Sequence, residues 1–277
     1  MSHPFVAIPS YIHIYQGVGA DQVNGSEIAD YLKLIVKRAK VDLRLEFFNF
    51  CLSFYSGEAK ADILNETAVQ MAKIKVRDVT KKDVLSEPMP LEIEYEKKNL
   101  LKSTGRTFGI LYEGFKLQQL YLKLINKEER DLKHLHFIIT DQLFATWDHN
   151  NHRYHARTSI YGLPSLLSTS GVVEAPAKPR DFYLKRQLGE DPHLLKEEYQ
   201  ESFIDYSDPR MTDVLKGYVA QALFYHLAGY PFCEDKNCRL FNAHRQSELI
   251  HAQILSPYEF CPTHQALLDQ LEEVLSD

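Results

Sequence analysis

The feature that most constrains this chain is a pair of short Cys and His motifs in its C-terminal third. Cys233 and Cys238 enclose four residues, and Cys261 and His264 enclose two. Both pairs lie in polar turns with a proline close by, between segments of helical pattern. Two such pairs have the composition and spacing of a closed tetrahedral Cys3His zinc site. We therefore predict that this part of the chain folds around one structural zinc ion held by these four side chains.

The composition is that of an ordinary globular protein. Of 277 residues, 44% are hydrophobic and 25% are charged, and the formal net charge is −6 with both signs interspersed. Such a balance gives no strong field toward nucleic acid or an anionic membrane, so neither is an expected partner. Few cysteines and an N-terminus unlike a signal peptide favour a cytoplasmic location, where paired cysteines more often bind metal than form disulfides.

Hydrophobic periodicity predicts strands separated by helices. The expected strands are 11–15, 43–55, 91–95, 107–112, 134–140 and 153–161, and the expected helices are 27–40, 57–73, 115–126, 208–228, 243–255 and 263–275. Ser26 is the expected N-cap of the first helix. The stretch 162–180, with three prolines and two glycines, is expected to be an irregular loop.

This order of elements indicates an α/β (α+β) fold: a mixed twisted sheet with helices on its faces. No internal repeat or linker divides the chain, so we expect a single domain over residues 1–277. Within it, residues 1–200 should form the sheet-and-helix core, and residues 208–277 should form the helical zinc-binding part.

The segment HLAGYPFCEDKNCRLFNAH, followed by EFCPTHQALL, resembles the C-terminal end of the archaemetzincins, a family of metzincin-type zinc metallopeptidases. That family carries HExxHxxGxxHC, then CxxxxCxM, and later FCxxC. The resemblance covers roughly residues 221–268. It implies a metzincin-like fold and a structural zinc site in which His264 replaces the last cysteine. The chain is also similar to an archaeal group of degenerate metallopeptidase-like proteins, a likeness that implies no activity.

The resemblance fails at the positions that carry the chemistry. The residues standing at the first catalytic histidine, the general-base glutamate, the third histidine and the Met-turn methionine are Ala222, Leu223, Phe232 and Leu240. His226 alone matches a catalytic histidine. A metzincin needs three imidazoles to hold the catalytic zinc and a carboxylate to accept a proton from its water. We therefore predict a non-catalytic relative that binds a peptide or protein partner, with His226 as a core histidine.

A rival interpretation is a metal-dependent hydrolase with a relocated site. His244, Glu248 and His251 occupy positions i, i+4 and i+7 of an expected helix and would share one face, where His226 could join them. A polar stripe on an amphipathic helix gives the same pattern. A purely structural role within an assembly is a third alternative. For the peptide-binding interpretation, we expect a groove along the strand 153–161, because metzincin-type proteases bind substrate along such a strand.

Overall fold

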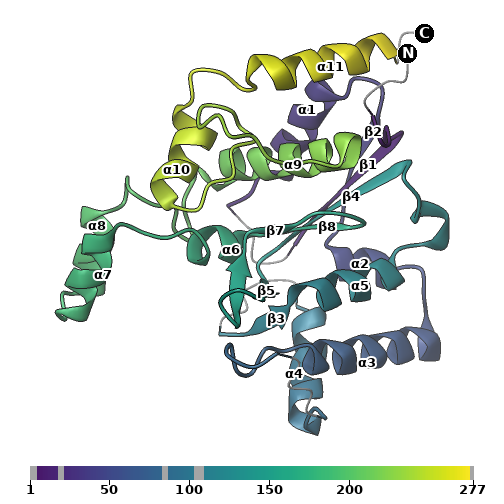
Figure 1. Cartoon of the computed structure of the whole chain (residues 1–277). Coiled ribbons are helices and arrows are strands. Elements are labelled where there is room, and N and C mark those ends of the chain that lie inside the picture. The colour runs from purple at the N-terminus through teal and green to yellow at the C-terminus, as the bar shows by residue number, and fades with distance from the viewer. Residues whose placement is uncertain (1–4, 18–21, 83–86, 103–108, 275–277) are drawn as a thin grey trace.

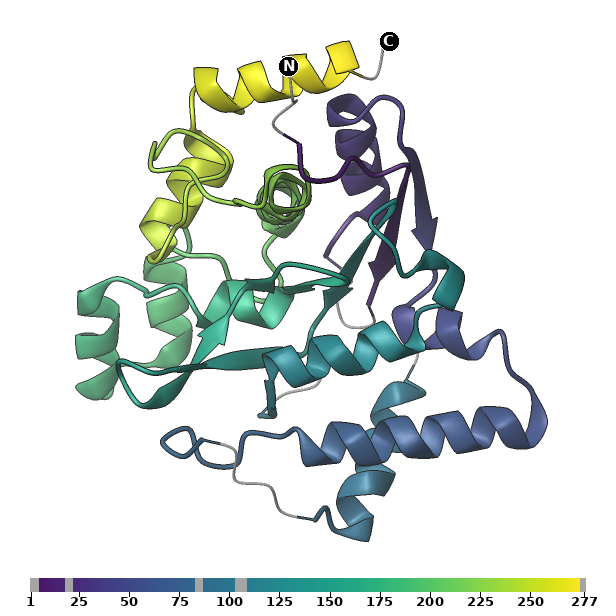
Figure 2. The ribbon, with the colours of Figure 1, turned by 45° about the vertical axis from the view of Figure 1, so that its right-hand side comes forward.

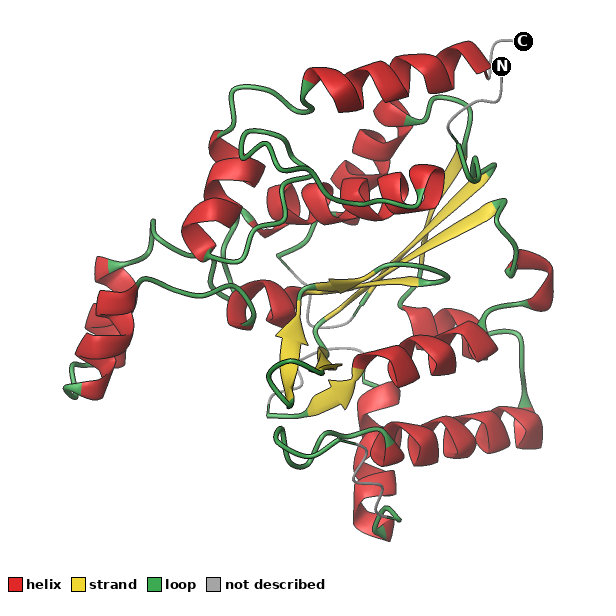
Figure 3. Ribbon diagram, viewed as in Figure 1, coloured by secondary structure: helices red, strands yellow, loops and turns green. Residues whose placement is uncertain are grey.

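A five-stranded sheet separates two layers of helices in the computed structural model, which describes residues 5–17, 22–82, 87–102 and 109–274 (Figures 1 and 3). Its strands are β1 (Tyr11–Gln16), β2 (Lys40–Arg44), β4 (His134–Thr140), β7 (Ser159–Ile160) and β8 (Ser165–Ser168). They are ordered β2-β1-β4-β8-β7, with the first four parallel and the edge strand β7 antiparallel to β8. The predicted mixed sheet flanked by helices is confirmed.

A second, three-stranded sheet lies beside the first. It contains β3 (Leu111–Glu113), β5 (Leu143–Asp148) and β6 (Arg153–Arg157), in the order β3-β5-β6. The predicted strand 153–161 is therefore shared between two sheets, since β6 pairs with β5 and β7 pairs with β8. Thr158 lies at the transition, and its carbonyl accepts a hydrogen bond from the Ser168 N–H at 2.8 Å.

One face of the large sheet is covered by the N-terminal helix and the C-terminal helices. These are α1 (Gly25–Ile35), α9 (Met211–Ala228), α10 (Gln246–Ile250), the π-helical turn His251–Leu255 that continues it, and α11 (Pro262–Val274). Because side chains alternate along a strand, Ile12 and Ile14 of β1 and Phe137 of β4 all face this layer. Figure 2 views α9 nearly along its axis and shows it between the sheet and the C-terminal helices.

The opposite face packs against helices from the middle of the chain. These are α2 (Phe47–Leu52), α3 (Gly57–Lys73), α4 (Pro90–Leu100), α5 (Gly114–Leu124) and the short 3-10 helix Lys127–Glu129. Tyr15 of β1 and Ile138 of β4 point into this core. No helix in the described ranges is both long and apolar enough to cross a bilayer.

The remaining helices connect β8 to α9 along the chain. They are α6 (Thr169–Glu174), α7 (Arg180–Gln187) and α8 (Pro192–Glu198). Helices α7 and α8 project from the body of the molecule (Figure 1) and enclose a small cluster of their own. That cluster consists of Phe182, Leu195, Tyr199 and Phe203.

Two predicted strands are wrong because aromatic or alternating patterns concealed helices. In the range 43–55, β2 ends at Arg44 and α2 begins at Phe47. The side chain of Glu46 caps α2 by accepting a hydrogen bond from the Asn49 N–H at 2.9 Å. In the range 91–95 the alternation belongs to α4, where Pro90 occupies the first helical turn.

The predicted loop 162–180 is also wrong. It contains β8, whose four residues are buried between β4 and β7, and then α6. The side chain of Ser168 caps α6 by accepting a hydrogen bond from the Gly171 N–H at 2.8 Å. A four-residue strand buried on both faces has no alternation of polar and apolar side chains, which is why its pattern was not distinctive.

Several predicted boundaries shift. Asn24, and not Ser26, caps α1, since its side-chain oxygen accepts hydrogen bonds from the N–H groups of Ser26 and Glu27 at 3.1 and 3.2 Å. This helix ends at Ile35 because the chain turns there into β2. Of the predicted strand 107–112, residues 107 and 108 lie outside the described ranges, and the strand begins at Leu111.

Gly171 allows α6 to approach the segment between β6 and β7 closely, so a larger residue at this position should destabilise the fold. A Cβ atom at this position would lie 2.2 Å from the Arg157 carbonyl oxygen and 2.9 Å from the Thr158 Cα. Because both are backbone atoms, Gly171→Ala must displace the strand, and we expect it to lower the free energy of unfolding by about 1–3 kcal/mol. Chemical denaturation measures this loss, and an unchanged free energy would contradict the close approach.

Candidate metal centre

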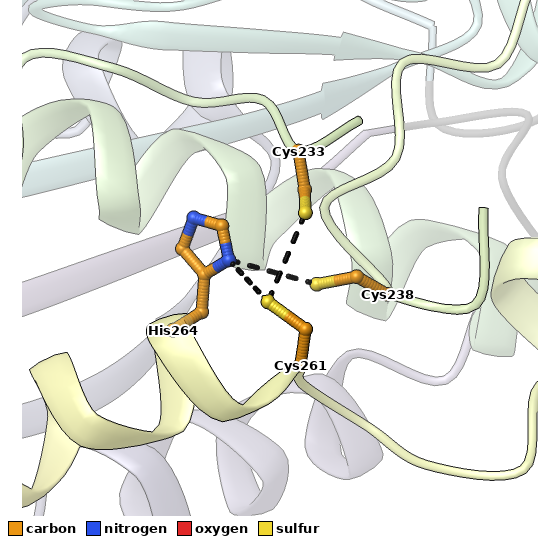
Figure 4. A group of neighbouring side chains, drawn as sticks. All are labelled: Cys233, Cys238, Cys261 and His264. Atoms are coloured by element: carbon orange, nitrogen blue, oxygen red, sulfur yellow. Dashed lines mark hydrogen bonds between the residues drawn. The ribbon is translucent and has the colours of Figure 1, made fainter. Parts of the chain in front are cut away.

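The structure brings Cys233, Cys238, Cys261 and His264 together (Figure 4). The first two lie in the loop after α9, the third directly precedes α11, and the histidine is in the first turn of that helix. The Sγ atoms of Cys233 and Cys261 are 3.8 Å apart. The Nδ1 atom of His264 lies 3.8 Å from the Sγ of Cys238 and 3.0 Å from that of Cys261.

These separations fit a tetrahedral ion. Zinc bonds of about 2.3 Å to sulfur and 2.0 Å to nitrogen place the ligand atoms roughly 3.5–3.8 Å apart. Both 3.8 Å distances match this spacing, and the shorter one requires the His264 ring to shift by a few tenths of an ångström. Three thiols and one imidazole are also the donor set of a closed structural site.

Local backbone structure presents the ligands. Gly229 ends α9 with φ of +76°, a left-handed conformation that suits glycine and reverses the chain. The loop is then held by the N–H of Cys233, which donates to the Leu240 carbonyl at 2.9 Å. In addition, the Asp235 N–H donates to the Cys233 sulfur at 3.4 Å, as expected for a turn that favours a thiolate.

Without a bound cation, the buried cysteines of the Cys3His group stay protonated. Burial raises the pKa of Cys238 to about 12, and burial also raises the pKa of Cys233. Burial lowers the pKa of His264, so its imidazole is neutral at pH 7 and able to bind metal. A divalent ion reverses the preference of the thiols, because it stabilises thiolates strongly enough to remove their protons.

The relocated site of the rival interpretation does not assemble. Within the described residues, the ligand atoms of three or more Cys, His, Asp or Glu side chains converge in two groups, and neither contains His226, His244, Glu248 or His251. The helix begins only at Gln246, so His244 precedes it and does not share its face. Glu248 instead caps this helix, accepting hydrogen bonds from the N–H groups of His244 and Arg245 at 2.9 and 3.1 Å.

The second converging group, His13, His134 and His136, was not predicted from the sequence. His13 lies on β1 and the other two lie on β4. The available signal was the HxH pattern within HLHFIIT, because alternate residues of a strand share a face. Burial lowers the pKa of His136 to about 4, so this ring is neutral at physiological pH.

A groove of about 460 Å³ lies against the edge strand β7. Its walls come from β6, β7, α9 and the loop after α9, and they carry several aromatic side chains. The lining includes Tyr161, Tyr218, Tyr225, Tyr230 and Phe232. The predicted groove beside the strand 153–161 therefore has a counterpart in the structure.

The two buried cysteines Cys238 and Cys51 provide a matched test of the metal centre. Both are almost fully buried, but Cys51 belongs to the other core. Cys238→Ala should abolish metal retention and lower the thermal midpoint strongly, because a structural zinc contributes ~10 kcal/mol of binding free energy to folding. Cys51→Ala should keep its metal and lose only about 1 kcal/mol. Elemental analysis measures the metal content of each variant, and thermal unfolding with and without a chelator measures its stability. Retention of metal by Cys238→Ala would contradict the assignment of Cys238 as a metal ligand.

Similarity to a known family covers most of the chain. No curated protein and no solved structure matches it significantly. A family model described as "Probable metallopeptidase family" matches residues 8–271. This match and the Cys and His groups together point to a bound metal ion. The chain belongs to the probable metallopeptidase family.

Proposed function

We propose that this chain is a non-catalytic, zinc-stabilised relative of archaemetzincin-type proteases that binds an extended peptide segment of a partner protein in the groove beside β7. The observation that carries this function is the aromatic groove itself. It lies along an edge strand and next to α9, the helix whose residues stand at the catalytic positions of the archaemetzincin pattern.

The residues at those positions support a loss of catalysis. Ala222 and Leu223 are buried in the core and offer neither an imidazole nor a carboxylate. His226, predicted as a core histidine, is only half-buried; its Nε2–H donates to the Leu132 carbonyl at 2.9 Å, so the ring carries its proton on that nitrogen. Activation of water by zinc needs an open metal site and a base, and this helix supplies neither.

The groove suits apolar and aromatic side chains. The ring of Tyr161 lies 6.1 Å from the rings of both Tyr225 and Phe232, measured between centroids. Its hydroxyl donates to the Oε1 of Gln221 at 2.5 Å, and the Nε2 of Gln221 donates to the Phe241 carbonyl at 3.0 Å. These bonds fix the floor of the groove before any ligand arrives, which reduces the entropy lost on binding.

The edge strand β7 offers backbone N–H and C=O groups that can pair with a bound peptide. Because β7 ends the sheet, an extended peptide can pair with it and add a strand, while its alternate side chains enter the groove. In the lining of the groove, the exposed Arg157 is oriented by its Nε, which donates to the Thr146 hydroxyl at 2.7 Å. A guanidinium in this position favours a peptide that carries an acidic residue.

The metal centre supports the groove. Phe232 forms part of the wall, and Cys233 follows it directly in the chain. A metal ion that holds Cys233 therefore limits the motion of the loop that carries Tyr230 and Phe232. In this arrangement the zinc acts on binding through the position of the wall and takes no part in any reaction.

Tyr225 and Tyr183 allow a matched test of peptide binding. Their exposed fractions are 40% and 41%, but Tyr225 lines the groove and Tyr183 lies on α7. For fluorescein-labelled extended peptides rich in aromatic and acidic residues, Tyr225→Ala should raise the Kd about 5–30-fold, because a central aromatic contact contributes ~1–2 kcal/mol. Tyr183→Ala should leave the Kd unchanged, as measured by fluorescence polarisation.

Two outcomes would contradict the proposed function. Equal effects of the two substitutions would show that the groove does not bind the peptides. Peptide hydrolysis by the wild-type protein, abolished by a chelator and restored by zinc, would show that the chain is an active metallopeptidase, the activity named in the description of its family.

A further inference from the structure

Three histidines form a cluster on β4, the central strand of the large sheet, and its neighbour β1. In the parallel pairing of β1 with β4, His13 lies opposite His136, and Tyr11 lies opposite His134. All three histidines point to the same face because they occupy alternate positions. One ring nitrogen from each lies within 4.8 Å of the others. We propose that His13, His134 and His136 bind a divalent transition-metal ion such as zinc.

The ring nitrogens already approach metal-binding distance. The Nε2 of His13 lies 2.9 Å from the Nδ1 of His134. Two ligands of a tetrahedral zinc ion at about 2.0–2.1 Å would be roughly 3.3 Å apart, so binding requires these rings to separate by a few tenths of an ångström. It also requires the proton that His134 shares with His13 to move from Nδ1 to Nε2 of His134. The half-buried His134 is the ring with room to move, whereas His13 is buried.

In metal-binding histidines, the ring nitrogen that does not bind the metal usually donates a hydrogen bond to a carboxylate or carbonyl oxygen. Two of the three rings have such a bond. The Nδ1 of His13 lies 2.5 Å from the Oδ1 of Asp42, so this N–H donates to the carboxylate and the Nε2 lone pair faces the cluster. The Nε2 of His136 donates to the Glu129 carbonyl at 2.9 Å. The Nδ1 of His136 is then unprotonated and accepts a hydrogen bond from the Tyr15 hydroxyl at 3.1 Å, which a metal ion would replace.

The surrounding charges favour a cation. Arg44 is paired with two carboxylates: it donates two hydrogen bonds to Glu129, at 2.6 and 2.7 Å, and one to Asp42 at 2.8 Å. Two carboxylates and one guanidinium leave one net negative charge beside the histidines. A divalent ion bound to three neutral imidazoles would be partly compensated by this charge, which lowers the cost of its desolvation.

The site is separate from the Cys3His centre and from the groove. Ile12 and Ile14, the neighbours of His13 in the strand, face the layer that contains α9, whereas His13 faces the opposite side. The inference therefore does not depend on the proposed peptide binding. Three imidazoles leave one coordination position for water or another ligand, as in zinc sites that are not closed.

Metal counting in the full chain tests the site. After dialysis against zinc and then metal-free buffer, the wild type should hold two zinc ions per chain, and His134→Gln should hold one. His226→Gln serves as a control and should hold two, since His226 belongs to neither group. A single ion in the wild type, or two ions in His134→Gln, would overturn the site and leave the three rings as a hydrogen-bonded cluster.

Cobalt substitution and a second variant separate loss of the site from loss of the fold. Cobalt in the thiolate site gives strong ligand-to-metal charge-transfer absorption, whereas cobalt held by imidazoles gives only weak visible bands. His134→Gln should keep the former and lose the latter. Asp42→Asn should raise the Kd of the second cobalt ion about 10–100-fold, because Asp42 orients His13. Unchanged cobalt affinity in Asp42→Asn would contradict the role assigned to this carboxylate.

Discussion

The burial of α9 is the constraint on which the rest of the structure depends. This helix packs against the sheet on one side and the C-terminal helices on the other, so apolar side chains surround most of it. Residues such as Leu223 and Phe224 each contribute roughly 1.5–3 kcal/mol through burial. The same helix carries Gln221 and Tyr225 of the groove, and it leads into the loop of the metal centre.

The burial of α9 supports the proposed loss of catalysis. Apolar side chains at Ala222 and Leu223 add to the core on which the fold depends, whereas a zinc-binding histidine and a glutamate would need a polar site there. The Cys3His group lies farther along the chain, beside the groove, so a metal ion bound there would hold the wall of the groove in place. The proposed peptide binding depends on this scaffold and not on catalytic residues.

The two faces of the sheet have different chemistry. The face toward α9 is apolar along β1 and β4, while the other face carries His13 and His136 beside Tyr15. Polar groups inside a sheet are stable only when they are fully hydrogen-bonded. The partners Asp42 and Glu129 provide those bonds, so the same contacts that stabilise the fold also orient the histidines.

The sequence by itself determined the features that depend on local spacing. The four residues between Cys233 and Cys238, the periodicity of α3 and the apolar run of β4 act within a few residues, so their patterns were sufficient. Only the tertiary structure decided which pattern prevailed in two ranges. In 43–55 an aromatic, alternating pattern fits a strand as well as the helix α2, and in 162–180 burial of β8 on both faces removes the contrast between polar and apolar sides. The tertiary structure also brought His13 to His134 across 121 residues, because the register of a parallel strand pair is set by packing and not by local sequence.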